Sequence, residues 1–182
     1  PRPLPTPSPN NSQKQEDTPQ PLPSQQPTST QQPVKTNGKK LVKRKTYIYK
    51  GLKYKITTLT KKSGTASLVT ASKKSLKQAV IPSILHMNGY KLKVTAIGKN
   101  AFRNFRQLKR ITIGRNIKKI GAGAFRRCVK LKKIQIQSRI LTSVGKKAFS
   151  GIPQKASITV PKKMREKYKA LILRNFYYNL IV

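Results

Sequence analysis

The residues able to perform acid–base chemistry are few in this chain. Its 182 residues contain 41 Lys and Arg but only three Asp and Glu and one His. Glu16 and Asp17 belong to a proline-rich N-terminal stretch, so Glu166 is the only acid in the remainder. Acid–base hydrolysis needs a pair of carboxylates, and a Ser-His-Asp triad needs an aspartate beside its histidine. The sequence therefore predicts that the chain is not an enzyme.

The single histidine and the single cysteine do not make a metal site either. His86 has no second His, Cys or carboxylate at ligand spacing, and Cys128 lacks the partner that a disulfide or a two-cysteine metal motif requires. Gly121 and Gly123 form a Gly-x-Gly pair without the further glycine of a phosphate-binding loop. We expect no metal ion and no organic cofactor, and we assign Cys128 to the core.

Basic side chains are the remaining groups with binding chemistry. The net charge is +38, and residues 39–182 hold +37 of it, because 38 Lys and Arg face one acid there. Such an imbalance favours polyanionic partners. Arg forms forked hydrogen bonds with phosphate, sulfate or carboxylate, and seven of the 11 arginines fall between Arg103 and Arg139. The candidate polyanion-binding residues are Arg103, Arg106, Arg110, Arg126, Arg127 and Lys133.

A recurring segment must position these basic residues. Ile97–Phe102, Ile120–Phe125 and Val144–Phe149 share the pattern aliphatic-Gly-x-x-Ala-Phe, in steps of 23 and then 24 residues. A period of this length is typical of stacked repeats, in which each copy is too small to bury its own apolar face. The predicted repeat core consists of Ile97, Phe102, Leu108, Ile111, Ile113, Ile120, Phe125, Cys128, Leu131, Ile134, Ile136, Val144, Phe149, Ile158 and Val160.

Each copy also predicts a short strand. Isoleucines alternate with polar residues in 110–113 and 133–136, and 157–160 repeats the last apolar pair. Alternation of this kind places the apolar side chains on one face and the polar ones on the other. The outward side chains should then stack in two rows, Arg110 with Lys133 and Ser157, and Thr112 with Gln135 and Thr159.

The remaining parts of each copy predict turns. The glycine after the aliphatic residue permits a tight or positive-φ turn. The Ala-Phe-x-x-apolar segment, which ends at Phe105, Cys128 or Ile152, places two apolar side chains on one side of a short helical turn. We expect every copy to contribute a strand, a turn and a helical stub to one shared core.

The segment before the repeats predicts a cap of β-hairpins. Tyr47–Ile56 alternates on both sides of a Lys-Gly pair, and Ile84–Val94 flanks an Asn-Gly pair, which is the strongest short hairpin signal. Ala66–Thr70 and Ala79–Ile81 suggest a second strand pair. These strands should cover the open sheet edge at the start of the stack.

The segment after the repeats predicts a helical cap. Pro161 ends sheet pairing, and Met164–Leu173 has helical spacing of its apolar residues. The final segment, 176–182, is too short to cross a bilayer. We expect it to pack as a further cap strand, and the alternative is an exposed apolar terminus.

The repeated pattern Leu-x-x-Ile-x-Ile, then Ile-Gly-x-x-Ala-Phe-x-x-Cys, resembles the BspA-like leucine-rich repeat family over residues 94–160. The third copy departs from it, because Lys155 stands where Leu108 and Leu131 stand. The resemblance implies a mainly β solenoid (α+β) of about three repeats with a β-hairpin cap and a C-terminal helical cap. It also implies a secreted or surface-attached bacterial protein used for adhesion or ligand binding rather than catalysis.

The amino-acid composition separates an N-terminal linker from the part of the chain that folds. Residues 1–38 carry most of the 13 prolines and few apolar groups, which predicts a disordered Pro/Gln/Thr-rich linker. We assign 39–93 to the β-hairpin cap region, 94–160 to the repeats and 161–182 to the helical cap. The chain begins at Pro1 without Met and shows no signal peptide or membrane span, so we expect a mature product or a fragment.

Three functional hypotheses follow. The first is a non-catalytic extracellular or cell-surface adhesion module that binds an anionic cell-wall or host polymer or an acidic protein surface. The second makes the chain the C-terminal targeting module of a larger cell-wall or surface enzyme. The third is sequence-independent nucleic-acid binding, since no base-reading motif is present. Against all three stands the interpretation that the basic residues are solvated charges or a compositional bias, and the oligomeric state is left open.

Overall fold

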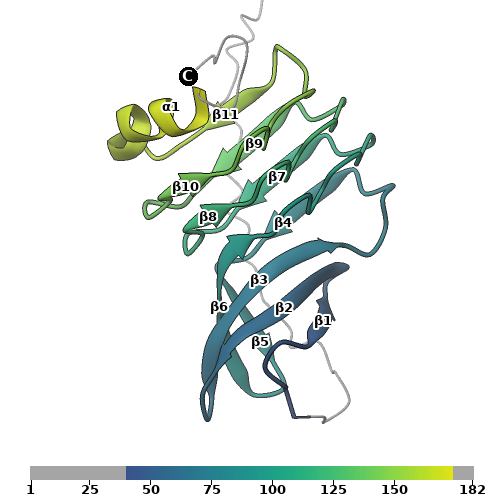
Figure 1. Ribbon diagram of the computed structural model, residues 1–182, viewed down its shortest axis with the longest axis vertical. Coiled ribbons are helices and arrows are strands. Elements are labelled where there is room, and N and C mark those ends of the chain that lie inside the picture. The colour runs from purple at the N-terminus through teal and green to yellow at the C-terminus, as the bar shows by residue number, and fades with distance from the viewer. Residues whose placement is uncertain (1–39, 174–182) are drawn as a thin grey trace, which may run out of the picture. The chain divides into compact units, whose positions relative to one another are not determined.

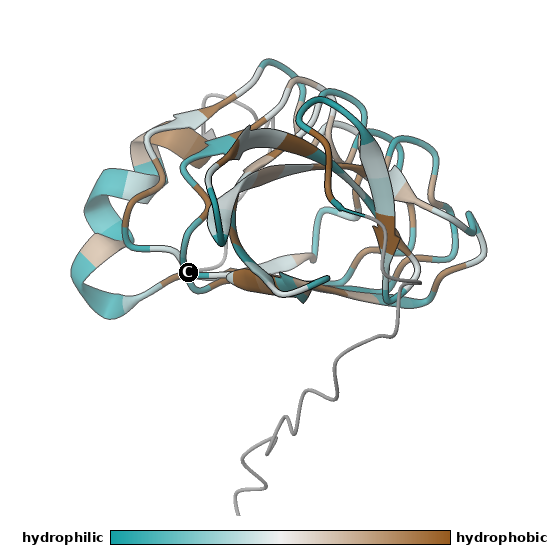
Figure 2. Ribbon diagram, turned by 90° about the horizontal axis from the view of Figure 1, so that it is seen from below, coloured by the Kyte–Doolittle hydropathy of each residue, from teal (hydrophilic) through white to brown (hydrophobic). Residues whose placement is uncertain are grey.

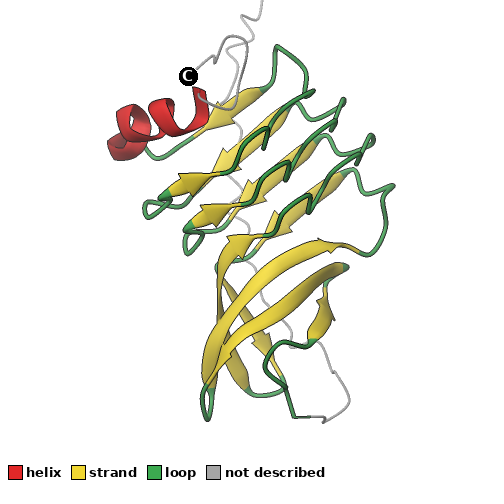
Figure 3. Cartoon of the chain, viewed as in Figure 1, coloured by secondary structure: helices red, strands yellow, loops and turns green. Residues whose placement is uncertain are grey.

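The computed structural model describes residues 40–173 of the chain. This part contains eleven strands, one 3-10 helix and one α-helix (Figures 1 and 3). Their bounds are β1 Thr46–Tyr49, β2 Leu52–Leu59, β3 Ser63–Ala71, β4 Gln78–Ile81, β5 Ile84–Met87, β6 Tyr90–Ile97, β7 Arg110–Ile113, β8 Lys119–Ile120, β9 Lys133–Ile136, β10 Ser143–Val144, β11 Ser157–Thr159, η1 Lys162–Met164 and α1 Arg165–Leu173.

The strands form two sheets that run along the stack of repeats. One has the order β1-β2-β3-β6-β8-β10, with β5 also paired to β6, and the other has the order β11-β9-β7-β4. All pairs in the four-stranded sheet are parallel, as are β6 with β8 and β8 with β10. Successive coils therefore add one strand to each sheet, and they lie over one another when viewed from below (Figure 2). The predicted β-solenoid fold is confirmed.

The four-stranded sheet contains one more strand, β4, than the three that the repeat pattern predicted. β4 pairs in parallel with β7, with Gln78 opposite Arg110 and Ile81 opposite Ile113. The prediction that Ala79–Ile81 pairs with Ala66–Thr70 is wrong, because β3 pairs with β2 and β6 instead. β4 opens the stack of parallel strands.

A ladder of phenylalanines fills the centre of the stack. The rings of Phe102 and Phe125 lie 5.5 Å apart and 8° from parallel, and those of Phe125 and Phe149 lie 5.3 Å apart and 9° from parallel. Aromatic pairs of this kind contribute about 0.5–1.5 kcal/mol each beyond the burial of their area. The other predicted core residues are buried as well, except for Val144 and Val160, which are half-buried.

The glycine of each Ile-Gly pair serves close packing and not a positive φ. A Cβ at Gly98 would lie 2.8 Å from the carbonyl oxygen of Leu68, and one at Gly121 would lie 2.6 Å from the carbonyl carbon of Gly98. Backbone atoms of adjacent coils occupy the space that a side chain would need. Positive φ occurs two residues after these glycines, for example at Asn100 and at Gly123.

The segments around the phenylalanines are turns and not the predicted helical stubs. Arg103 N–H donates to the carbonyl of Asn100 and Phe105 N–H donates to that of Phe102, both in the i to i+3 pattern of a tight turn. Asn100 has φ 56° and Asn104 has φ 63°, and residues at positive φ interrupt a right-handed helix. The backbone conformation thus ends each helical turn after a single hydrogen bond.

Both predicted hairpins are present at the start of the described chain. β1 pairs with β2 around Lys50 and Gly51, and β5 pairs with β6 around Asn88 and Gly89. All four turn residues have positive φ, as a two-residue type I′ turn requires. β3 then pairs in parallel with β6, so the N-terminal strands extend the seven-stranded sheet beyond the repeats and cover that edge.

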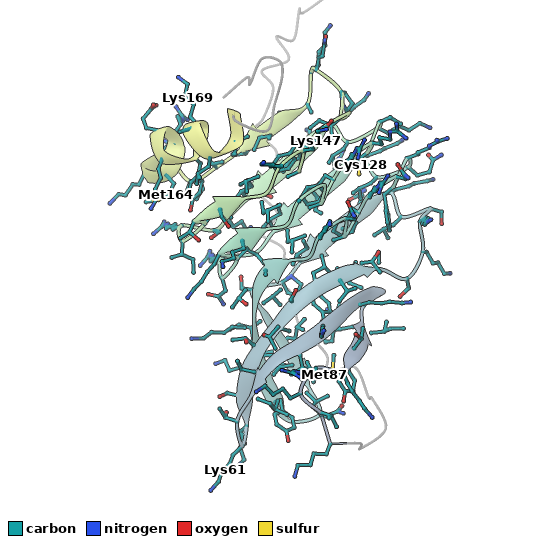
Figure 4. All side chains as sticks on the ribbon, viewed as in Figure 1. Lys61, Met87, Cys128, Lys147, Met164 and Lys169 are labelled. Atoms are coloured by element: carbon teal, nitrogen blue, oxygen red, sulfur yellow. The ribbon has the colours of Figure 1, made fainter. Side chains whose placement is uncertain are left out.

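Helix α1 follows the last strand, as predicted. Tyr168 and Ile172 are buried in the core, while Met164 and Leu171 pack against it half-exposed. Figure 4 labels Met164 in η1, Lys169 in α1, and Lys61 at the tip of the β2–β3 hairpin at the other end. The predicted linker, 1–38, and the predicted terminal strand, 176–182, lie outside the described residues.

Candidate binding surface

The described residues do not bring together the side chains that a metal ion needs. Residues 40–173 contain no group of three His, Cys, Asp or Glu side chains able to hold a metal ion. The Cys128 thiol is buried and donates a hydrogen bond to the carbonyl oxygen of Phe102 at 3.0 Å, and burial raises its pKa to about 12. The thiol is therefore neutral at physiological pH and packs as part of the core.

The four-stranded sheet presents two rows of polar side chains on its outer face. Arg110 is in register with Lys133, and Lys133 is in register with Ser157. The second row joins Thr112 to Gln135, and Gln135 to Thr159. The alternation read from the sequence therefore produces the two rows that it predicted.

A shallow depression of about 300 Å³ lies on this face. We call it the sheet-face site, and it is lined by Arg110, Ile111, Thr112, Lys133, Ile134, Gln135, Ser157 and Thr159. The Thr112 hydroxyl donates to the amide oxygen of Gln135 at 3.4 Å, which links the two central coils. Two cations beside a row of hydroxyl and amide groups suit a ligand that carries both negative charge and hydrogen-bonding oxygens.

The two cations in the sheet-face site stand side by side without a counter-charge. Strands in a sheet lie about 4.8 Å apart, so Arg110 and Lys133 repel each other. Like charges placed opposite each other destabilise a sheet by a few tenths of a kcal/mol when exposed. Glu166, on α1, is the only acid among residues 40–173. A bound anion would relieve this repulsion.

The other predicted arginines lie on a different part of the coils. Arg103 and Arg106 belong to the loop between β6 and β7, and Arg126 and Arg127 belong to the loop between β8 and β9. These loops are joined by a hydrogen bond from Asn104 N–H to the carbonyl of Arg126 at 2.9 Å. The six predicted residues therefore divide between two surfaces, and only Arg110 and Lys133 line the sheet-face site.

Strand β4 adds two residues to the rows that the sequence prediction missed. Gln78 is in register with Arg110, and Val80 is in register with Thr112. The side chain of Val80 is 65% exposed. A signal was present in the sequence, since Leu76-x-x-Ala79-x-Ile81 matches the pattern with alanine in place of the first isoleucine.

Parallel coils that share a phenylalanine ladder, with one short strand per coil on an outer polar face, define a leucine-rich repeat solenoid. A model of the BspA type leucine-rich repeat region, in six copies, matches residues 69–175. The chain belongs to this family. Repeat proteins of this family generally act as binding scaffolds and not as catalysts.

Solved structures show the same fold. A leucine-rich cell surface protein from Faecalibacterium prausnitzii A2-165 has a TM-score of 0.53 and 21% identity, covering 64% of this chain and 31% of that chain. A leucine-rich repeat protein from Bacteroides capillosus ATCC 29799 has a TM-score of 0.51 and 20% identity, covering 64% of this chain and 98% of that chain. This chain thus spans about a third of the F. prausnitzii protein.

Two further findings concern sequence relatives and membrane-spanning helices. No curated protein matches the chain in sequence. Within residues 40–173, no helix is both long enough and apolar enough to cross a membrane.

Proposed function

We propose that this chain is a non-catalytic binding module, located outside the bacterial cell or on its surface, whose sheet-face site holds an acidic partner. The partner is an anionic cell-wall or host polymer or an acidic protein surface. One observation carries the proposal: Arg110 and Lys133 are register partners beside a row of hydroxyl and amide groups, in a depression without an acidic side chain. Such a site supplies charge attraction and hydrogen-bond donors together.

The surrounding charge supports this proposal. Residues 39–182 carry +37, so an anionic partner is attracted before it reaches the site. A rigid stack of coils holds the two cations at one spacing, which a flexible basic tail does not. The location outside the cell is supported by the family and by the similarity to a cell surface protein of F. prausnitzii.

The test measures binding of the full chain to heparin, lipoteichoic acid, poly-glutamate and a neutral glycan at several salt concentrations. The double variant R110Q/K133Q is compared with R103Q/R126Q, which removes the same charge from the loops. We expect R110Q/K133Q to bind anions about tenfold more weakly than R103Q/R126Q does, because it also removes charge-assisted hydrogen bonds to the ligand. Equal losses in both variants would show general charge attraction instead of a site.

A second candidate function is that of a targeting module within a larger surface protein. The observation in its favour is that this chain spans 31% of the F. prausnitzii relative, so repeats of this kind occur in much longer proteins. The test fuses residues 1–182 to a fluorescent protein and measures retention on bacterial cell walls. Retention lost in R110Q/K133Q, but kept in R103Q/R126Q, supports targeting through the sheet-face site, and no retention of the wild-type fusion contradicts it.

Binding to nucleic acid is a competing outcome for the same surface. The charge permits sequence-independent contact with phosphates, and the binding measurements therefore include two DNA duplexes of unrelated sequence. Duplex binding stronger than binding to every other anion would replace the proposed partner with nucleic acid.

A further inference from the structure

We infer that the acidic partner of the sheet-face site is a protein segment that binds in extended form along the free edge of β4, as an added strand. This inference rests on the proposed function and names the class of partner. Four observations carry it: the direction of the β4 peptide groups, the uneven capping of the two sheets, the exposure of Val80 and the charge around the edge.

The backbone N–H and C=O groups along one edge of β4 have no strand to pair with among the described residues. Within residues 40–173, β4 is the outermost strand of its sheet and pairs with β7 alone. The carbonyl of Lys77 accepts from Lys109 N–H at 2.7 Å, so it points toward β7. Because the backbone N–H and C=O groups of successive residues point to opposite sides of a strand, those of Gln78 and Val80 point away from β7. Among residues 40–173, none outside β7 forms a backbone hydrogen bond with Gln78 or Val80.

The two sheets are capped differently at this end of the solenoid. The seven-stranded sheet continues past β6 through β3, β2 and β1, so the hairpins cover its repeat edge. The four-stranded sheet stops at β4 (Figure 1). Free strand edges are templates for pairing with another chain, and proteins normally protect them. In the described part of the chain, no strand protects the β4 edge, which adjoins the sheet-face site, as the hairpins protect the other sheet.

Val80 marks this edge as a contact surface. Its side chain is 65% exposed, more than that of any other large hydrophobic residue in the described part of the chain. It lies on the outer face next to Thr112. A strand added at β4 would place an apolar side chain beside Val80 on the same face, and cross-strand pairs with β-branched residues stabilise a sheet.

The charge around β4 selects an acidic segment over a second copy of this chain. Lys73, Lys74 and Lys77 are exposed in the loop that leads into β4, and Arg110 lies opposite Gln78 on the adjacent strand. Two copies, each with a net charge of +38, repel each other at this edge. An extended peptide that alternates acidic and apolar residues can place its carboxylates near the lysines and its apolar side chains against Val80.

The test uses two synthetic peptides of about six residues, the usual length of a strand. One alternates Glu with Val, and the other has the same side chains with N-methyl groups on all backbone nitrogens, so neither of its edges can donate main-chain hydrogen bonds to a strand. We expect the full chain to bind the first peptide at low salt and the methylated peptide about tenfold more weakly, because main-chain hydrogen bonds supply much of the affinity of an added strand.

Two variants test the edge from the protein side. V80P removes an N–H that the sheet does not use, and proline is tolerated at such edge positions. V80T keeps the N–H and the branched shape. We expect V80P to weaken binding of the Glu-Val peptide by about tenfold and V80T by about twofold. Circular dichroism and thermal unfolding report whether V80P remains folded.

The outcomes separate this inference from the proposed function. Equal binding of both peptides, together with a loss in R110Q/K133Q, overturns the added strand but leaves an acidic ligand on the sheet-face site. Failure of poly-glutamate and of both peptides to bind at low salt overturns the proposal of an acidic protein partner as well. A wild-type dimer that V80P abolishes, seen by sedimentation, overturns the inference in favour of a second copy.

Discussion

The hydroxyl of Tyr168 donates a hydrogen bond to the carbonyl oxygen of Ser138 at 3.1 Å. The same hydroxyl accepts from the N–H of Leu141 at 2.9 Å. All three residues are buried, and the Ser138 hydroxyl in turn donates to the carbonyl of Ile117 at 2.6 Å. One side chain of α1 therefore satisfies two backbone groups where the last coil turns from β9 to β10, which joins the helix to the repeat stack.

Removing this hydroxyl should loosen the helical cap. Y168F leaves the N–H of Leu141 and the carbonyl of Ser138 buried without their partner, and a buried unsatisfied group costs about 1–3 kcal/mol. We expect the free energy of unfolding, measured in urea, to fall by that amount. The control is Y90F at a half-buried position, where no described residue pairs with the hydroxyl. Equal losses in both variants would contradict a stabilising role for the two hydrogen bonds of the Tyr168 hydroxyl.

Removing the hydroxyl of Tyr54 should have the opposite effect. Tyr54 is fully buried in β2, and no described residue forms a hydrogen bond with its hydroxyl. Burial also raises the pKa of this phenol well above its usual range. We expect Y54F to increase the free energy of unfolding by about 1 kcal/mol, since an unpaired buried hydroxyl is replaced by an apolar edge. A decrease would indicate that the hydroxyl has a partner, such as a buried water molecule.

The buried thiol predicts a loss of stability at alkaline pH. The pKa of Cys128 rises from 9.0 to about 12 on burial, so the folded state disfavours the thiolate. The unfolded chain loses this proton near pH 9 and the folded chain near pH 12, so stability present below pH 9 is lost as the pH rises between them.

Urea unfolding under reducing conditions at several pH values between 8 and 11 measures this effect. C128A removes the titrating group, so its stability should fall less with pH than that of the wild type, whatever its starting value. Parallel curves for the two proteins would contradict the prediction. In addition, the native protein should not react with a thiol reagent at pH 8 until it unfolds, because the thiol is both buried and neutral.

The backbone at Arg127 is strained and should be improved by asparagine. Arg127 has φ 59°, and the matching residues of the neighbouring coils are Asn104 and Gly151, which tolerate positive φ. We expect R127N to raise the free energy of unfolding by about 1 kcal/mol. R126N is the matched control, because it removes the same charge at a residue without positive φ. A gain of equal size in R126N would attribute the effect to reduced charge repulsion.

Local patterns alone determined most of the architecture. The 23- and 24-residue steps, the alternation in 110–113 and 133–136, and the two-residue turns predicted the solenoid, the outward rows and both hairpins. These features follow from contacts within a strand or turn, or between identical positions of adjacent coils. Short-range periodicity is therefore enough to infer them.

Tertiary structure alone decided the pairing of β4, the reason for the Ile-Gly glycines and the division of the arginines. β4 pairs with a strand 32 positions further on, and Ala79 weakens its apolar signal. Gly98 is required because the backbone at Leu68, from a different part of the chain, comes too close for a Cβ. Arg103 and Arg110 are near neighbours in sequence but lie on a loop and on a strand face. Such features depend on which distant segments meet in the folded chain, and the repeat pattern indicates this only weakly, through the match of Leu76, Ala79 and Ile81 to its apolar positions.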